Sequence, residues 1–198
     1  MVQSRAHLDP APAHLQLKVT LLDIRPAIWR RLLVPAKLKL PQLHTALQRA
    51  FGWTDSHLHA FQSRDASYEA FHPDDWAGDF SGPGQRYDEK KFRVGDLLRA
   101  KGDQLTYEYD FGDSWRHKII VEKVLPAAPS KIVVCLAGAR AGPPEDCGSI
   151  PGYYNLVAAM ADPKHPEHDE LLNWLGEPFD PEAFNLEAVN FLLSHIKS

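Results

Sequence analysis

The amino-acid sequence predicts an α+β fold: a mostly antiparallel, roll-like sheet with a helix packed on one face, followed by a C-terminal group of helices. Strand-like segments fill most of residues 14–140 and are interrupted by one amphipathic helix, whereas the segments after residue 152 have helical patterns only. The composition, 44% hydrophobic and 24% charged residues in a chain of 198, is typical of a globular domain.

The first two strands are expected at residues 15–24 and 27–35, where β-branched residues and leucines alternate with polar residues. Pro26 separates them because proline cannot donate to the strand ladder, so the two segments form a hairpin. A helix is expected at 41–51, where apolar residues recur at helical spacing and Gly52 provides the stop. Its residues that should pack on the sheet are Leu43, Ala46, Leu47 and Ala50.

The later strands are separated from the helix by a long excursion. Residues 63–90 contain many Gly, Pro and Asp residues and no sustained period, so no regular element is expected there. One helical turn is expected within 94–103. The remaining strands are expected at 56–63, 104–111, 114–126 and 132–138.

The chain changes character after Gly152. Three helical patterns, divided by prolines and a glycine, are expected at 152–163, 166–176 and 185–196. No linker of flexible composition precedes them, so residues 14–198 are interpreted as a single domain and residues 1–13 as a disordered lead-in.

Missing signals exclude several protein classes. No run of about 18 apolar residues is available to span a membrane. The N-terminus lacks the apolar segment of a secretory signal, and the two cysteines, Cys135 and Cys147, are too few for a disulfide-built scaffold. We therefore expect a cytoplasmic protein without a membrane partner, of unknown oligomeric state.

Charge is distributed unevenly along the chain. Residues 1–140 contain 20 basic and 16 acidic side chains, whereas residues 141–198 contain 2 and 10. A basic segment without acids lies between Ile24 and Thr54. Three alternatives are open: the segment forms a nucleic-acid surface, the acidic C-terminal part folds against it, or it is a solvated face. Its candidate nucleic-acid-binding residues are Arg25, Arg30, Arg31, Lys37 and Lys39, of which strand alternation sends the adjacent arginines to opposite faces.

Five sequence blocks occur in one order over roughly residues 14–195. They are LKVTLLDIRPAIWRRLLVP, LHTALQRAFGWTDSHLHAF, YEYDFGDSWRHKIIVEKVLP, CLAGARAGPPEDCG and DPKHPEHDELLNWLGEPFDPEAFNLEAVN. Together they resemble the plasmid pRiA4b ORF-3-like family. The resemblance implies an α+β roll and an association with plasmids and insertion elements, in which such proteins are known as TnpR-type passengers. It implies no particular activity, and the sequence lacks the order of elements of a serine recombinase.

One departure from the family lies in the block AGPPEDCGS, where many relatives read ACPPEDCGG. Gly142 and Ser149 stand in place of a cysteine and a glycine. This chain therefore lacks one thiolate that a cysteine-zinc site shared by the family would need.

His57 and His59 are candidate ligands of a divalent metal ion, the one cofactor that the sequence indicates. On the strand expected at 56–63 they would share one face with Phe61. Two imidazoles on one face of a strand can bind a single metal. The alternative is a pair of half-buried histidines that cover the sheet.

The segment YDFGDSWRH, residues 109–117, combines two aspartates and a histidine with three aromatic residues. A turn between two strands needs one Gly with a positive φ and one Asp that bonds its own backbone, which explains Gly112 and a single aspartate. Asp110, Asp113 and His117 are therefore candidate catalytic residues in a turn that also lines a pocket. We expect Asp110 or Asp113 to lie beside residues 57–59.

A second polar loop, PPEDCG at 143–148, contributes the candidates Glu145, Asp146 and Cys147. The acids could transfer protons or bind metal, and the thiol would need a neighbouring base to act as a nucleophile. The alternative is an ordered loop in which Asp146 caps backbone amides. The sequence has no glycine-rich phosphate loop, GxSxG, CxxC or HExxH motif.

Two functions are left open by these patterns. The sequence favours an uncharacterised accessory or binding protein of plasmids and mobile elements, which acts through a protein or nucleic-acid contact. The alternative is a small metal-dependent hydrolase or nuclease with a His and Asp cluster. Convergence of the histidines and carboxylates in one place would support the second function.

Overall fold

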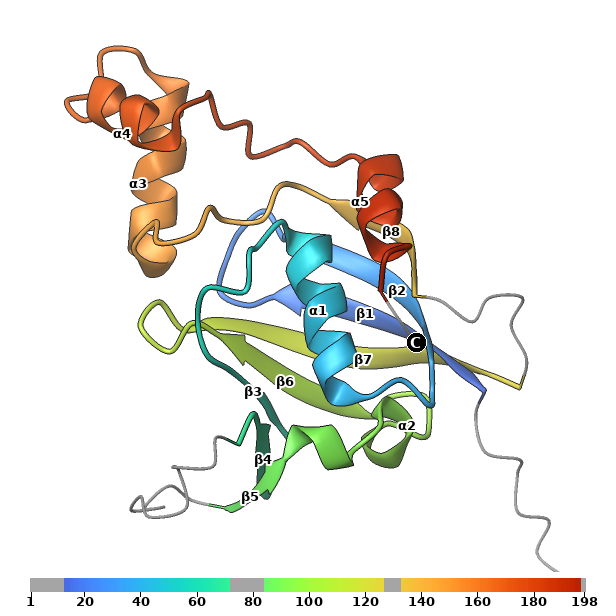
Figure 1. Cartoon of the computed structure of the whole chain (residues 1–198). Coiled ribbons are helices and arrows are strands. Elements are labelled where there is room, and N and C mark those ends of the chain that lie inside the picture. The colour runs from blue at the N-terminus through green and yellow to red at the C-terminus, as the bar shows by residue number, and fades with distance from the viewer. Residues whose placement is uncertain (1–12, 72–83, 127–132, 197–198) are drawn as a thin grey trace, which may run out of the picture.

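The computed structural model describes residues 13–71, 84–126 and 133–196 and is built around one eight-stranded sheet (Figure 1). The strand order is β5-β4-β3-β6-β7-β1-β2-β8, and neighbouring strands are antiparallel except for β4 and β5. The strands are β1 (His14–Leu21), β2 (Trp29–Pro35), β3 (His59–Gln62), β4 (Ala66–Glu69), β5 (Gln85–Asp88), β6 (Gln104–Tyr109), β7 (Trp115–Leu125) and β8 (Val134–Ala139). The α+β fold and the first hairpin are confirmed.

Helix α1 (Leu40–Phe51) lies across one face of this sheet (Figure 1). Pro41 occupies its first turn, and Gly52 ends it in the left-handed conformation with a φ of 87°. The four residues that helical spacing assigned to the interface are all buried: Leu43, Ala46, Leu47 and Ala50. The predicted helix and its packing face are therefore confirmed.

The chain after β8 forms α3 (Ser149–Ala161), α4 (His168–Leu175) and α5 (Leu186–Leu193). Helix α5 returns to the sheet, where it contacts β8 and α1 and buries Leu193. Helices α3 and α4 pack on each other and extend away from the sheet (upper left in Figure 1). Helix α3 is anchored by buried residues such as Tyr153, whereas α4 has no buried residue.

The prediction that residues 63–90 contain no regular element was wrong. Residues 63–90 contain the short strands β4 and β5 and the 3-10 helix η2 (Glu89–Lys91), because pairing in the sheet orders segments that have no pattern of their own. Residues 72–83 of this excursion lie outside the described residues, as does nearly all of the expected lead-in at 1–13. The single turn α2 (Val94–Leu97) follows and agrees with the prediction.

The turn between β6 and β7 also differs from the prediction. It spans residues 110–114, and the residues with positive φ are Asp110 (57°) and Ser114 (55°) rather than Gly112. Aspartate tolerates this conformation because its short side chain can bond the neighbouring backbone.

The sheet has one covered and one open face. Every second residue of β1 is buried beneath α1, whereas Gln16, Lys18 and Thr20 between them are half-exposed on the opposite face. Strand β7 alternates in the same way, with Ile119 buried and Lys118 exposed. Among the described residues, no helix has the length and apolar character needed to cross a bilayer.

Candidate metal centre

Three segments that are distant in the sequence meet where β3 begins and β6 ends: residues 53–58, the turn at 110–114 and the loop at 143–148. Trp53 Nε1 donates a hydrogen bond to Pro143 O at 2.8 Å, and Thr54 N donates to Glu145 Oε1 at 2.8 Å. These bonds attach the loop to the chain that leads into β3.

Asp113 attaches the same loop to the β6–β7 turn. Its Oδ2 accepts from Gly148 N at 3.2 Å, and its carbonyl accepts from Ser149 Oγ at 2.8 Å. Asp113 therefore positions the polar loop at 143–148, but it is not one of the carboxylates that surround His57.

His57 is the centre of that group. Its Nε2 lies 3.0 Å from Asp146 Oδ1, 3.8 Å from Asp110 Oδ2 and 3.9 Å from Glu145 Oε2. The nitrogen is shielded from solvent and forms no hydrogen bond: the oxygens of Asp110 and Glu145 are too distant, and Asp146 Oδ1 is close enough but not in hydrogen-bond geometry. The expected proximity of Asp110 to residues 57–59 is confirmed.

The 3.0 Å separation of His57 and Asp146 matches that of two ligands on one cation, whereas Asp110 and Glu145 lie farther from His57, at 3.8 and 3.9 Å. Two ligand atoms bound at about 2.1 Å and at angles of roughly 90–110° lie about 3.0–3.4 Å apart. The ligand atoms of His57, Asp110 and Asp146 lie within 4.8 Å of one another, so side-chain rotations would be needed to place all three on one ion. One imidazole with carboxylates suits Mn²⁺, Fe²⁺ or Zn²⁺.

Asp110 is oriented by its own turn. Its Oδ1 accepts from Gly112 N at 2.9 Å and Asp113 N at 3.3 Å, and its own N–H donates to Leu58 O at 2.9 Å. Because the turn uses Oδ1, the other oxygen, Oδ2, is left to face His57. Asp113, the second aspartate of the turn, thus holds the loop in place, and the left-handed backbone of Asp110 accompanies the side-chain orientation that faces His57.

Glu145 is fixed in a comparable way. Its Oε1 accepts from Thr54 N and from the Tyr109 hydroxyl, at 2.8 and 2.9 Å, and Oε2 lies 3.2 Å from the same hydroxyl. Burial, reinforced by Glu145, raises the pKa of Tyr109 above its usual range. The phenol therefore keeps its proton at neutral pH and donates it to the carboxylate.

The group opens to solvent on one side. The Asp146 side chain is 66% exposed, whereas that of Asp110 is 11% exposed and that of His57 is 29% exposed. A bound cation would be held from the protein side and remain accessible to water and substrate from the side of Asp146.

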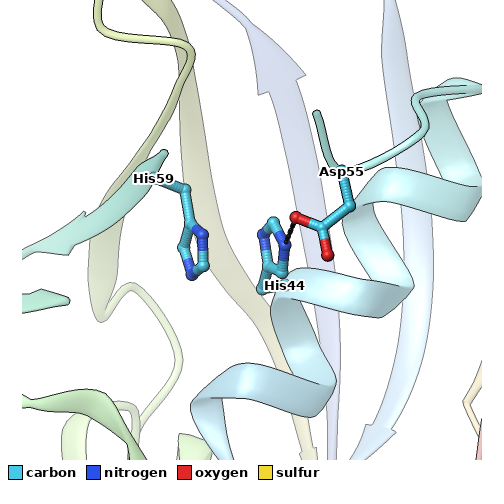
Figure 2. A group of neighbouring side chains, drawn as sticks. All are labelled: His44, Asp55 and His59. Carbon is cyan, nitrogen blue, oxygen red and sulfur yellow. Dashed lines mark hydrogen bonds and ion pairs between the residues drawn. The ribbon is translucent and has the colours of Figure 1, made fainter. Parts of the chain in front are cut away.

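A second group, His44, Asp55 and His59, lies between α1 and β3 (Figure 2). The two imidazoles are stacked, with ring centroids 3.5 Å apart and planes at 5°. His44 Nε2 lies 2.7 Å from Asp55 Oδ1, and His59 Nε2 lies 2.9 Å from Glu89 Oε2. Figure 2 shows the near-parallel rings and the Asp55 carboxylate beside His44.

The hydrogen bonds of His44 make it a neutral donor and acceptor. The Asp55 carboxylate only accepts, so His44 Nε2–H donates to it at 2.7 Å; in the neutral ring Nδ1 then accepts from the Tyr107 hydroxyl at 2.8 Å, and this hydroxyl also accepts from Gln48 Nε2 at 3.0 Å. Burial and the neighbouring His59 lower the pKa of His44. Parallel rings direct their in-plane lone pairs side by side rather than at one point, so this group fits a hydrogen-bond network better than a metal site.

The expected pairing of His57 with His59 on one metal is therefore wrong. Strand β3 begins at His59, and His57 lies in the bend before it, so strand alternation does not apply to the pair. Each histidine belongs to a different group.

Two further candidates fit acid–base or nucleophilic roles poorly. His117 is fully buried between Phe51 and Trp53, and burial lowers its pKa to about 3. Burial, with a contribution from Asp113, raises the pKa of the Cys147 thiol to about 12, so at neutral pH it is not a thiolate nucleophile.

The basic segment does not form a single patch, which was one of the alternatives for it. Arg30 is buried, where its guanidinium donates to Ala50 O and Ala139 O, and burial lowers its pKa to about 10. Arg31, on the opposite face as predicted, pairs with Glu122 at 2.6 Å. The other candidates lie at opposite ends of β2: exposed Arg25 before the strand, and exposed Lys37 and half-buried Lys39 after it.

Several residues around the two groups were missed from the sequence. His44 lies one turn before Leu47 and one turn after Leu40, so helical spacing could have placed it on the buried face of α1. Glu89 follows a stretch without any period and gave no signal. Tyr107 and Tyr109 alternate with polar residues on β6, which indicates burial but not their role as partners of His44 and Glu145.

Comparisons with known proteins agree with the resemblance found in the sequence. Residues 13–188 match the family model of the plasmid pRiA4b ORF-3-like protein. The chain is 38% identical over 178 residues to the uncharacterized protein y4hQ of Sinorhizobium fredii (strain NBRC 101917 / NGR234), which covers 89% of this chain and 88% of that protein. The crystal structure of the protein of unknown function MM3350 from Methanosarcina mazei Go1 is similar with a TM-score of 0.77 and 34% identity, over 90% of this chain and 97% of that one. This chain belongs to the plasmid pRiA4b ORF-3-like family.

Proposed function

We propose that this protein is a small metal-dependent hydrolase whose cation is bound by His57, Asp110 and Asp146. The observation that carries the proposal is the shielded Nε2 of His57, which faces three carboxylate oxygens within 3.9 Å and bonds to none of them. Of the two functions that the sequence leaves open, the local geometry supports this one better.

The charge of the group favours a cation. Three carboxylates surround one imidazole, and their mutual repulsion is relieved by a divalent ion. The Lys and Arg ion pairs of the described residues are formed elsewhere, with Asp23, Glu69, Glu122 and Glu182.

The ligand number favours a catalytic rather than a structural site. Three protein ligands leave coordination positions for water and substrate, and a bound cation lowers the pKa of its water so that hydroxide is available near neutral pH. Glu145 is suited to accept a proton from such a water, because its Oε2 lies 3.9 Å from His57 Nε2 while Oε1 is held by Thr54 and Tyr109.

Metal binding is the first test. Chelator-treated protein should take up one Mn²⁺, Zn²⁺ or Co²⁺ per chain in calorimetry, and the bound ion should raise the melting temperature. Hydrolysis of activated phosphodiesters and carboxylic esters should then depend on the ion and stop with chelator. Absence of both binding and stabilisation would rule out the function.

Variants locate the ion. His57→Ala, Asp110→Asn and Asp146→Asn should each weaken metal binding by at least about tenfold, since even residues that support ligands indirectly contribute that much. Asp169→Asn, at an exposed position on α4, removes the same charge and should bind like the wild type. Glu145→Gln should lower the hydrolysis rate more than the metal affinity, as expected for a base.

An accessory role on plasmids and mobile elements, which the resemblance implies, stays a prediction. A hydrolase of this kind is compatible with that role, and activity assays with purified protein do not depend on it.

A further inference from the structure

The open face of the sheet has two adjoining hollows. One, of about 650 Å³, is lined by residues that include Gln16, Arg31, Lys101, Ile120 and Lys123. The other, of about 500 Å³, is lined by residues that include Gln62, Arg64, Gln104, Thr106 and Lys118. Lys118 and Ile120 are alternate residues of β7, about 7 Å apart, so the hollows meet along this strand.

Positive charge dominates both hollows. Their linings contain five cations, Arg31, Arg64, Lys101, Lys118 and Lys123, and one acid, Glu122. The arginine beside this acid neutralises it with bonds of 2.6 and 2.9 Å, and this pair lowers the pKa of Glu122 to about 2. Four exposed cations therefore have no acid within the hollows to balance them.

Other acids at the borders of this face are already bonded. Asp23 pairs with Arg116 at 3.2 Å, and Glu108 accepts from Gln62 at 3.1 Å and from Ser114 at 2.8 Å. Hydrogen bonds from the neutral side chains of Gln62 and Ser114 leave the charge of Glu108 in place, but the linings of the hollows themselves combine net positive charge with polar side chains, which is complementary to a polyanion.

We propose that this open face binds single-stranded nucleic acid. The cations suit the phosphate backbone, and the amide and hydroxyl side chains of Gln62, Gln104 and Thr106 suit the hydrogen-bonding edges of unpaired bases. Half-buried Trp29 lies on the same face, with Lys18 Nζ 5.4 Å and Arg31 Cζ 5.2 Å from its ring, and offers an aromatic surface to a base. A sheet face with an aromatic residue and flanking cations is a recurrent platform for single strands.

The proposal is independent of the metal centre and is tested with chelator present. Fluorescence anisotropy with labelled dT20 and rU20 should show binding at 50 mM salt. If three phosphates are contacted, affinity should fall roughly 20-fold between 50 and 200 mM salt, because each contact contributes about 0.7 to the logarithmic salt slope. A failed metal assay would leave this result unchanged.

Matched charge variants test the location. Arg64→Gln with Lys118→Gln should reduce the salt slope by about 1.4 and weaken binding at least tenfold. Lys37→Gln with Lys164→Gln removes the same charge from exposed positions outside both hollows and should bind like the wild type. Trp29→Leu should weaken binding about tenfold without a change in slope.

Three results would overturn the proposal: no binding of either oligonucleotide at 50 mM salt, equal loss in the two double variants, or equal affinity for a duplex of the same length. Circular dichroism and melting temperatures of all variants separate lost binding from lost folding.

Discussion

At the scale of single residues, the burial of His117 makes the stability of the fold depend on pH. The residue is fully buried and its pKa is lowered to about 3, whereas in the unfolded chain it is near 6.5. The unfolded state therefore binds more protons between these values, so stability is lost as pH falls below about 6.5. Between pH 6.5 and 5 this residue should reduce the free energy of unfolding by about 2 kcal/mol.

Denaturant unfolding of wild type and His117→Gln at several pH values measures this contribution as a difference in the slope of the unfolding free energy against pH. This difference does not depend on how much the substitution destabilises the protein at neutral pH. His165→Gln, which changes a histidine that is not fully buried, serves as the control and should retain the wild-type slope. Parallel curves for wild type and His117→Gln would show that His117 is not the proton-linked residue.

The burial of His117 could have been predicted from the sequence. His117 shares a strand face with Ile119 and Val121, and that pattern signals burial more directly than its aromatic neighbours signal catalysis. The contact of Asp110 or Asp113 with residues 57–59 was predicted because the turn carries one more aspartate than it needs, and it required the two flanking strands to be neighbours. The separation of His57 from His59 was not, because it depends on where β3 begins, a boundary that propensity does not fix.

At the scale of elements, the start of α3 is packed too closely for an ordinary helix substitution. A Cβ atom at Gly152 would lie 1.9 Å from Cys147 O. Gly→Ala inside a helix normally stabilises by roughly 0.5–1 kcal/mol, but here the clash should reverse the sign. Because the displaced loop contains Glu145 and Asp146, Gly152→Ala should also weaken metal binding.

Melting temperatures compare Gly152→Ala with Ala158→Gly, an exposed position of the same helix that should cost about 1 kcal/mol without affecting metal binding. A Gly152→Ala protein that is more stable than wild type and binds metal normally would contradict the close packing.

Long periodic elements were predicted well, and short ones were not. Residues 15–35 and 41–51 have patterns that repeat over several turns or alternations, and each element was found with its ends within three residues of the predicted ones. Strands β4 and β5 have four residues each, too few for a pattern, and exist because β3 provides an edge to pair with. Helix α3 begins before its predicted start because Gly148, with a φ of 87°, turns the chain into it.

At the scale of the whole molecule, the order of strands and the assembly of the metal centre are set by contacts between distant segments. Strand β6 pairs with β3, and β7 pairs with β1, neither of which follows from local patterns. The three segments that surround His57 come together only after this pairing. Sequence analysis could name most of these residues, but the grouping required the folded chain.

Helix α5 covers the edge of the sheet that is formed by strand β8. Strand β8 ends the sheet, and the backbone of Cys135 there pairs with a side chain instead of a strand: Asn190 Oδ1 accepts from Cys135 N at 2.8 Å, and Asn190 Nδ2 donates to Cys135 O at 2.9 Å. Helix α5, held also by Arg49 Nη1 donating to Leu192 O at 2.9 Å, thus covers an edge that could pair with another chain.

Asn190→Ala should leave both backbone groups without partners, at a cost of about 2 kcal/mol and a fall in melting temperature of roughly 4–8 °C. Asn190→Asp keeps one acceptor and should be less destabilising, whereas Asn173→Ala on the exposed side of α4 should be neutral. Light scattering should detect association of Asn190→Ala on mild heating, at temperatures where wild type and Asn173→Ala stay unchanged. If the melting temperature and the scattering of Asn190→Ala match the wild type, then α5 does not protect this edge, and buried Leu193 alone would account for its docking.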